Sequence, residues 1–175
     1  ANGKIIYSNV YLHQTHQTLY TFNPNKSRLL IIHRRYRGTH DFPTPEAARA
    51  WAKEEGWKVF PVYAYIHSGV VLRASEEGNP FSDPWDSGFF GLLLLNRKYW
   101  GRRPTLEQAS ALLEEYNRWM EGDCWSYTVR VGDREDSCGG FIGEDTVREA
   151  AQEAARRLFE EALEEELEQA LKEAA

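Results

Sequence analysis

The sequence is 175 residues long, the length of one ordinary domain, and its 42% apolar and 27% charged residues are typical of folded globular proteins rather than disordered ones. The formal net charge of −6 comes from residues 144–175, where 11 acidic and four basic side chains give −7, whereas residues 1–143 are nearly neutral. No apolar run reaches the roughly 20 residues of a membrane-spanning helix, so we expect no transmembrane segment, and the neutral body disfavours a broadly basic nucleic-acid-binding protein.

The N-terminal half of the chain is predicted to contain strands and one short helix. Segments rich in β-branched and aromatic residues predict strands over 4–12, 18–22, 27–34 and, as one long or two short strands, 58–73. Between two of them, residues 23–25 have the composition of a turn. Thr44 followed by Pro45 is typical of a helix start, and Gly56 marks the expected end of this helix.

A buried strand and a helix are predicted next. Residues 89–95 are apolar at every position except Gly91, which indicates a strand covered on both faces and central in its sheet. Thr105 and Gln108 have the spacing of a capping box, which predicts a helix to about residue 120.

The last segments are predicted to be a hairpin over 124–142 and a long helix. In the hairpin, side chains at 125, 127, 129 and 131 share one face. A second capping box at Thr146 and Glu149 predicts a helix that reaches about Lys172.

The order of these elements lacks a regular alternation of strand and helix. We therefore predict an α+β fold, as a single domain in which a mixed, mainly antiparallel sheet packs with two to three helices. Residues 1–143 are expected to form the α+β core. Residues 144–175 are expected to form an acidic helix of the same domain that packs on the core or projects from it.

Two cysteines, Cys124 and Cys138, lie in the predicted hairpin. If its turn is centred on Asp133 and Arg134, Cys138 lies opposite Val129 and the two thiols point to opposite faces, so we expect no disulfide. Free thiols and the lack of a signal-peptide pattern favour a cytoplasmic protein. Two cysteines without histidines at suitable spacing give no metal-binding pattern, so we expect neither metal nor cofactor.

A first polar cluster follows the strand predicted over 27–34. It contains His33, Arg34, Arg35, His40 and Asp41. The aspartate is placed to orient an imidazole, as acid-base chemistry requires, and an exposed basic loop is the simpler interpretation.

A second cluster mixes cations with aromatic rings. It contains Arg97, Lys98, Trp100, Arg102 and Arg103. Such residues would contact phosphates and stack on bases, so direct nucleic-acid binding is one hypothesis for this cluster.

Further polar side chains lie where strands are expected to end. They are His67, Ser68, Asp86, Ser87, Asp136 and Ser137. Together with the first cluster they would form a ligand pocket if the fold brings them together. The simpler interpretation of the stretch at 84–88 is a turn whose amides are satisfied by Asp86 or Ser87 and which Trp85 and Phe89 anchor. Neither a phosphate-binding loop motif nor a G-x-S-x-G motif is present.

The C-terminal helix offers an acidic surface. Its candidate contact residues are Glu161, Glu164, Glu165 and Glu168. A solvated helix face is the simpler interpretation, and a negative surface for a basic partner is the alternative. A narrow apolar stripe, at 155, 159, 162, 163, 167, 170 and 171, leaves open packing on the body or pairing with a second copy.

Four motifs carry a resemblance to a known family. LLIIHRRYRGTHDF, VYAYIHSGVVL, DPWDSGFFGLLLL and DSCGGFIG, in this order, resemble a family of small uncharacterised proteins encoded by bacteriophages, plasmids and other mobile elements. The resemblance runs from about residue 29 to 143. The chain departs from the family pattern at Asp83, where relatives often have cysteine, and at Gly139, where they often have an aromatic residue.

The resemblance implies an accessory protein of a mobile element that acts in the host cytoplasm. Such proteins usually act on the host, often by binding and blocking a protein or protein–nucleic acid complex that serves defence or transcription, and the resemblance implies no settled activity and favours a protein that is not an enzyme. The alternatives are a small-ligand or nucleotide binder, or a hydrolase with a His/Asp/Ser pocket, and direct nucleic-acid binding through the basic-aromatic loops.

Overall fold

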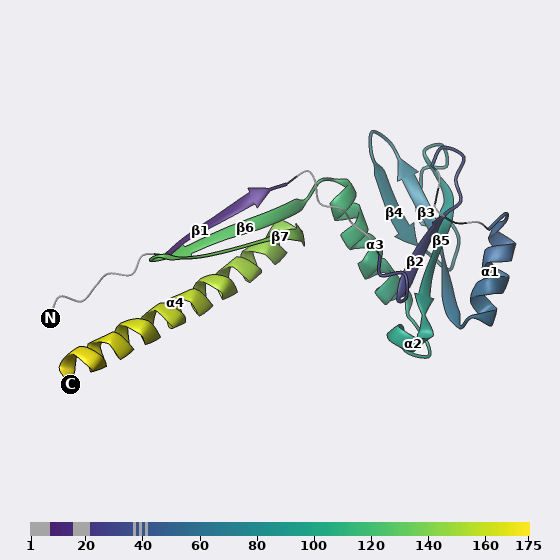
Figure 1. Cartoon of the computed structure of the whole chain (residues 1–175). Coiled ribbons are helices and arrows are strands. Elements are labelled where there is room, and N and C mark those ends of the chain that lie inside the picture. The colour runs from purple at the N-terminus through teal and green to yellow at the C-terminus, as the bar shows by residue number, and fades with distance from the viewer. Residues whose placement is uncertain (1–7, 16–21, 37, 39, 41) are drawn as a thin grey trace. The chain divides into compact units, whose positions relative to one another are not determined.

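The computed structural model describes residues 8–15, 22–36, 38, 40 and 42–175 (Figure 1). The strands over this part of the chain are β1 (Ser8–Gln14), β2 (Ser27–Ile31), β3 (Trp57–Ile66), β4 (Val70–Ala74), β5 (Ser87–Asn96), β6 (Cys124–Val131) and β7 (Arg134–Ile142). The helices are α1 (Pro45–Glu54), α2 (Arg97–Trp100), α3 (Leu106–Met120) and α4 (Glu144–Ala174). The predicted α+β class and the long C-terminal helix are confirmed. Parts of the strands predicted over 4–12 and 18–22 lie outside the described residues.

The strands are divided between two antiparallel sheets, whereas the sequence indicated one. One sheet has the order β1-β6-β7 and the other the order β2-β5-β3-β4. The chain divides accordingly into a central unit, residues 22–121, and a terminal unit, residues 8–15 and 122–175. This division does not coincide with the expected boundary at residue 143, because β6 and α4 bury their apolar faces against each other.

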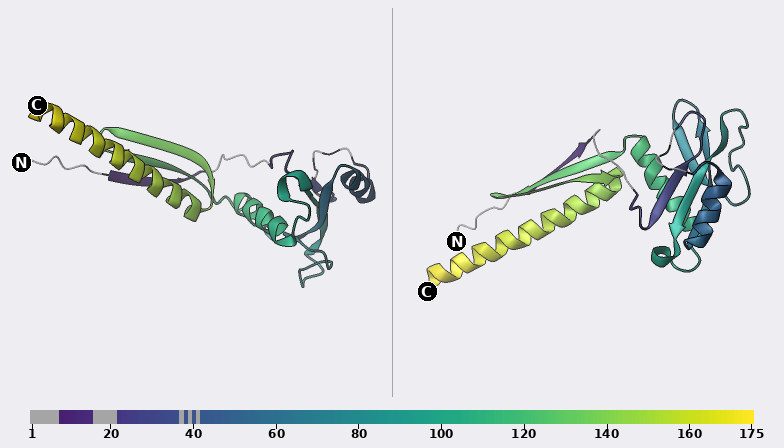
Figure 2. Two further views of the ribbon diagram at one scale, coloured as in Figure 1. Left: turned by 90° about the horizontal axis from the view of Figure 1, so that it is seen from below. Right: turned by 45° about the vertical axis from the view of Figure 1, so that its right-hand side comes forward.

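β5 is the middle of the central unit and is buried on both faces. The leucines at 92–95 are fully buried. Those at even positions pack with Ala48 and Ala52 of α1, and those at odd positions with Ala109 and Leu113 of α3. The two helices lie on opposite faces of the sheet (Figures 1 and 2). The prediction of a central strand covered on both faces is therefore confirmed.

Side chains cap the first and third helices as the sequence predicts. The Thr44 hydroxyl accepts a hydrogen bond from the Ala47 amide at the start of α1. At the start of α3, both bonds of the capping box between Thr105 and Gln108 are present. These bonds satisfy amides that would otherwise lack a partner in the first helical turn.

α4 begins earlier than predicted. Its N-cap is Gly143, with no side-chain cap bond, so the capping box expected at Thr146 and Glu149 is wrong. Gly143 has φ 95°, a value that favours glycine, and the chain turns there directly from β7 into the helix.

β2 ends at Ile31, three residues before its predicted end. Its pairing with β5 stops where Ile31 lies opposite Gly91, after which the Ile32 amide still donates to the Phe90 carbonyl at 2.8 Å. On the other edge of β5, the register with β3 passes from Gly91 to Phe89 and leaves Phe90 as a β-bulge. The bulge and the end of the β2 pairing coincide, so β2 and β5 separate beyond this point.

In the terminal unit, α4 packs along the sheet β1-β6-β7 (Figure 1). The buried side chains that form this contact are Val147, Ala151, Ala154 and Leu158 of α4 and Tyr127, Val129 and Val131 of β6. The shared face predicted for the hairpin is therefore confirmed. The stripe predicted on α4 is divided: Ala155 and Ala162 pack against this core, whereas four other members are between 39% and 64% exposed, namely Phe159, Leu163, Leu167 and Leu171.

The β6–β7 turn lies one residue earlier than predicted. It consists of Gly132 and Asp133, and Gly132 adopts φ 59°. Cys138 therefore lies opposite Tyr127 and not opposite Val129. Cys124 and Cys138 are not joined by a disulfide, as the sequence predicts.

A substitution at Gly91 tests the close packing of β2 against β5. A Cβ at this position would collide with the Leu30 carbonyl oxygen, which belongs to backbone and cannot move aside. We expect Gly91→Ala to lower the free energy of unfolding by about 3 kcal/mol in urea denaturation. Gly88→Ala on the same strand is the control, because its Cβ would enter open space, and it should change stability by less than about 1 kcal/mol. Equal effects of the two substitutions would contradict this packing.

Candidate functional site

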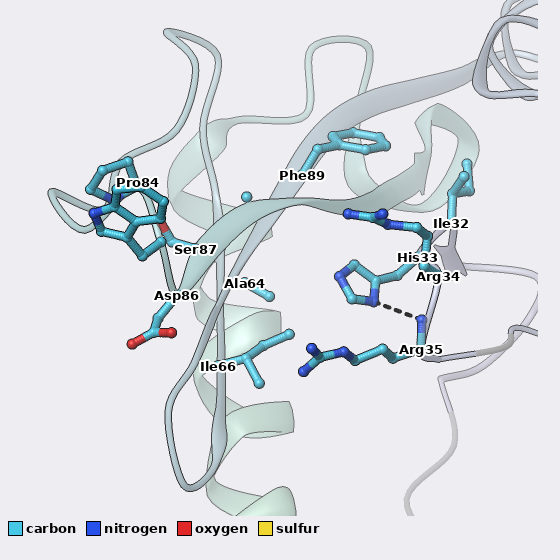
Figure 3. A pocket seen from close by; sticks show the side chains of 12 residues that line it. Ile32, His33, Arg34, Arg35, Ala64, Ile66, Pro84, Asp86, Ser87 and Phe89 are labelled. Carbon is cyan, nitrogen blue, oxygen red and sulfur yellow. Dashed lines mark hydrogen bonds between the residues drawn. The ribbon is translucent and has the colours of Figure 1, made fainter.

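A cleft opens in the central unit where β2 and β5 separate (Figure 3). Residues 32–35 form one wall and residues 84–89 the other, while Ala64 and Ile66 of β3 also line it. Its volume of about 730 Å³ lies within the range of sites for small ligands or short peptide segments.

The first wall carries two cations, the side chains of Arg34 and Arg35. The side chains of Arg34 and Arg35 are exposed, and neither forms an ion pair or a side-chain hydrogen bond with any residue that the structure describes. Both extend from their wall toward the strands opposite (Figure 3). The loop that presents them is fixed by His33, whose Nδ1 accepts a hydrogen bond from the Arg35 amide at 3.2 Å. The His33 ring also contacts the ring of Phe90, with centroids 5.5 Å apart.

The second wall is a turn organised by Asp83. One carboxylate oxygen of Asp83 accepts hydrogen bonds from the amides of Trp85, at 2.8 Å, and Asp86, at 3.2 Å. The Ser87 hydroxyl donates to the Asp83 carbonyl and accepts from the Asn79 side chain. Asp83, and not Asp86 or Ser87, therefore satisfies the turn amides.

Trp85 does not anchor this turn, contrary to the interpretation from sequence. Its side chain is 92% exposed, the largest exposure among the large apolar residues of the described chain. The sequence signal that marks it is its position in a turn between Pro84 and the polar pair Asp86 and Ser87. Phe89 is partly held, because its ring meets Tyr63 edge to face at 6.1 Å.

Asp86 faces His67. A carboxylate oxygen of Asp86 lies 3.1 Å from Nδ1 of His67, in the turn between β3 and β4. Such a pair fixes the orientation of an imidazole, which general acid-base chemistry uses. The adjacent Ser68 has φ 56°, an unusual value for a residue other than glycine. The hydroxyl nearest in sequence to Asp86, that of Ser87, is engaged by Asp83 and Asn79 and makes no bond to the imidazole.

The predicted pocket residues are thus only partly brought together. Those that line the cleft are His33, Arg34, Arg35, Asp86 and Ser87. His67 joins them through Asp86. His40 instead makes a backbone contact, since its Nε2 lies 2.9 Å from the Ile31 carbonyl oxygen. Asp41 lies outside the described residues.

Asp136 and Ser137 belong to β7 in the terminal unit and have structural partners there. The Asp136 carboxylate accepts hydrogen bonds from the Tyr127 hydroxyl at 3.1 Å and from Arg157 of α4 at 2.7 Å. Ser137 bonds Thr128 on the paired strand. Burial raises the pKa of Tyr127, and the hydrogen bond to Asp136 raises it further. Asp136 therefore helps to hold the helix on the hairpin.

The basic-aromatic cluster presents cations but not its tryptophan. The Trp100 indole donates to the Lys26 carbonyl at 3.0 Å, and its ring packs on the core under α3. Lys26 in turn lies over the Tyr99 ring, 5.9 Å from its centroid. Arg102 and Arg103 are exposed. The stacking surface expected for nucleic acid is therefore reduced, because the main ring is occupied within the fold.

The acidic surface of α4 is partly neutralised by its own unit. Glu161 and Glu165 both pair with Arg134 of β7, at 3.1 and 2.5 Å. Glu164 and Glu168 are exposed. Half of the predicted acidic contact residues thus fix α4 to the hairpin.

Comparison of the chain with models of protein families, with curated proteins and with solved structures finds no match. Within the described ranges, no three His, Cys, Asp or Glu side chains gather in a way that would hold a metal ion. In the same part of the chain, no helix has both the length and the hydropathy to cross a lipid bilayer. Function therefore has to be inferred from the side chains of the cleft.

The Asp83 turn gives a direct test of the second wall. Asp83→Ala removes the acceptor for the Trp85 and Asp86 amides, so their hydrogen exchange should accelerate and unfolding should cost about 1 kcal/mol less. Asp83→Asn keeps an oxygen at this place and should retain most of the protection. Equal exchange rates in the two variants would show that the side chain does not organise the turn.

Proposed function

We propose that the protein binds an acidic segment of a host protein in the cleft of the central unit, and that it acts in this way as an accessory protein of a mobile genetic element. The observation that carries the proposal is the pair of guanidinium groups, Arg34 and Arg35, which stand on one wall of an open cleft and pair with no residue that the structure describes. An arginine binds a carboxylate through two parallel, charge-assisted hydrogen bonds, which are stronger than neutral ones.

The tryptophan on the opposite wall favours a macromolecular partner. An indole that is 92% exposed leaves a large apolar surface in water. Tryptophan and arginine are the residues that most often dominate the binding energy of protein interfaces. Trp85 and the arginines line one cleft, so a single bound segment would contact both.

The local hydrogen bonds favour binding over hydrolysis. A serine nucleophile needs a base within hydrogen-bond reach. The Ser87 hydroxyl is held by Asp83 and Asn79, and the oriented imidazole of His67 bonds only Asp86 among the contacts described for it. The His67–Asp86 pair is instead placed to fix the turn that carries Trp85.

The resemblance to mobile-element proteins supports the biological side of the proposal. The motif at 33–36 and the motif at 84–88 lie on the two walls of the cleft, and the motif at 67–69 joins them through the His67–Asp86 bond. Three of the four motifs thus surround one site, and the fourth lies in the terminal unit. Binding of this segment would inhibit the host protein if the host protein uses the same segment to contact its own partners.

Charge reversal tests the proposal. The partner is first isolated from a bacterial host extract and purified. Arg34→Glu combined with Arg35→Glu should then weaken its binding by about 30-fold or more, because two carboxylates of the partner would lose their cations and meet like charge. The measurement is titration calorimetry of the purified pair.

Arg102→Glu combined with Arg103→Glu is the matched control, since it makes the same change of charge in an exposed pair of the same unit. This control should retain binding within about threefold, apart from long-range charge effects. If the control loses binding and the cleft variant keeps it, the interaction surface lies at the basic-aromatic cluster and the proposal is wrong.

A further inference from the structure

Among the described residues, no strand pairs with residues 87–89 of β5 on the side of the cleft. Residues 87–89 pair with β3, in the register Ser87 opposite Tyr65 and Phe89 opposite Tyr63. On their other side, β2 has already left the sheet, because its register with β5 ends at Gly91. The edge is three residues long, about 10 Å at ~3.3 Å per residue.

The backbone groups of this edge point into the cleft. The Asp86 carbonyl accepts from the Ile66 amide at 2.7 Å, so this carbonyl, just before the first residue of β5, faces β3, whereas the Asp86 amide donates to Asp83. Successive residues of a strand direct their N–H and C=O groups to opposite edges. The amides and carbonyls of Ser87 and Phe89 therefore face away from β3, toward the side of β5 on which the pairing with β2 has ended.

Aromatic contacts hold this space open. The bulged Phe90 meets the rings of His33 and Tyr36, with centroids 5.5 and 5.7 Å apart. The rings of His33 and Tyr36 also contact each other. The chain after β2 is thereby tied beside the bulge instead of continuing along β5. An unpaired strand edge is a template for another strand, and here the protein's own strand is kept away from it.

We propose that the acidic segment binds as an added strand on this edge, with main-chain hydrogen bonds to Ser87 and Phe89. This inference rests on the proposed function and specifies the form of its ligand: an extended acidic peptide. Figure 3 shows Arg34 extended toward Phe89 of β5 and Arg35 toward Ile66 of β3, so the two guanidinium groups point toward different strands that line the cleft. Side chains of an extended strand alternate between opposite faces, so neighbouring acidic residues would meet one arginine each.

The test uses short peptides and the full chain. The probe is a fluorescein-labelled hexapeptide with two adjacent glutamates flanked by valine and threonine, and its affinity is measured by fluorescence polarisation. N-methylation is then moved along the peptide one residue at a time. Strand addition predicts an alternating pattern, in which methyl groups at every second position weaken binding about tenfold or more and those between them by less than about threefold.

Two controls separate this inference from the proposed function. In the first control, a peptide with glutamine in place of both glutamates should bind about tenfold more weakly. In the second, the unmodified glutamate peptide should bind the Arg34→Glu, Arg35→Glu variant of the protein about tenfold more weakly than the unchanged protein. Equal sensitivity to methylation at every position overturns strand addition. If no acidic peptide binds while the purified host partner still depends on the two arginines, strand addition is wrong and the proposed function stands. If ATP or inorganic phosphate displaces the partner and no peptide does, the ligand is a phosphate compound and the inference falls.

Discussion

The burial of β5 on both faces is the constraint on which the central unit depends. Leucines at 92–95 fill two cores at once, so the strand cannot shift or slip without exposing one of them. Gly91 lets the Leu30 carbonyl pass at close range, and the bulge at Phe90 follows immediately. The last tight backbone contact, at Gly91, and the bulge where the cleft begins, at Phe90, are therefore adjacent in the chain. The cleft forms because the pairing of β2 with β5 stops at this point.

The polar residues around the cleft divide into those that build it and those left free. Asp83 organises the turn, and its bonds release Asp86 to hold His67. Of the described groups that line the cleft, Arg34, Arg35 and the exposed Trp85 make no polar side-chain contact that fixes them, and residues 87–89 present a short strand edge. Free cations, an exposed ring and unpaired amides are features of a binding surface, and together they favour an extended acidic ligand over a reacting one.

The sequence predicted what local patterns determine. The apolar run at 89–95 and the caps at Thr44 and Thr105 were confirmed, because burial and capping leave direct signatures. The early end of β2 was missed, since it depends on ring contacts between Phe90 and residues far away in the chain. The membership of Asp136 in the second sheet was missed for the same reason: nothing local shows that β7 pairs outside the sheet of β5. The exposure of Trp85 is only weakly indicated by the sequence, through the polar residues that follow it in the turn.

The most direct test of the account is to add a host protein that has been isolated by binding to this chain, and to map where it binds by amide chemical-shift perturbation. The account predicts that the largest changes fall at 32–35 and 84–89, the two walls of the cleft. Changes confined to 97–103, or to the exposed stripe of α4 at 159–171, with the cleft amides unmoved, would contradict it.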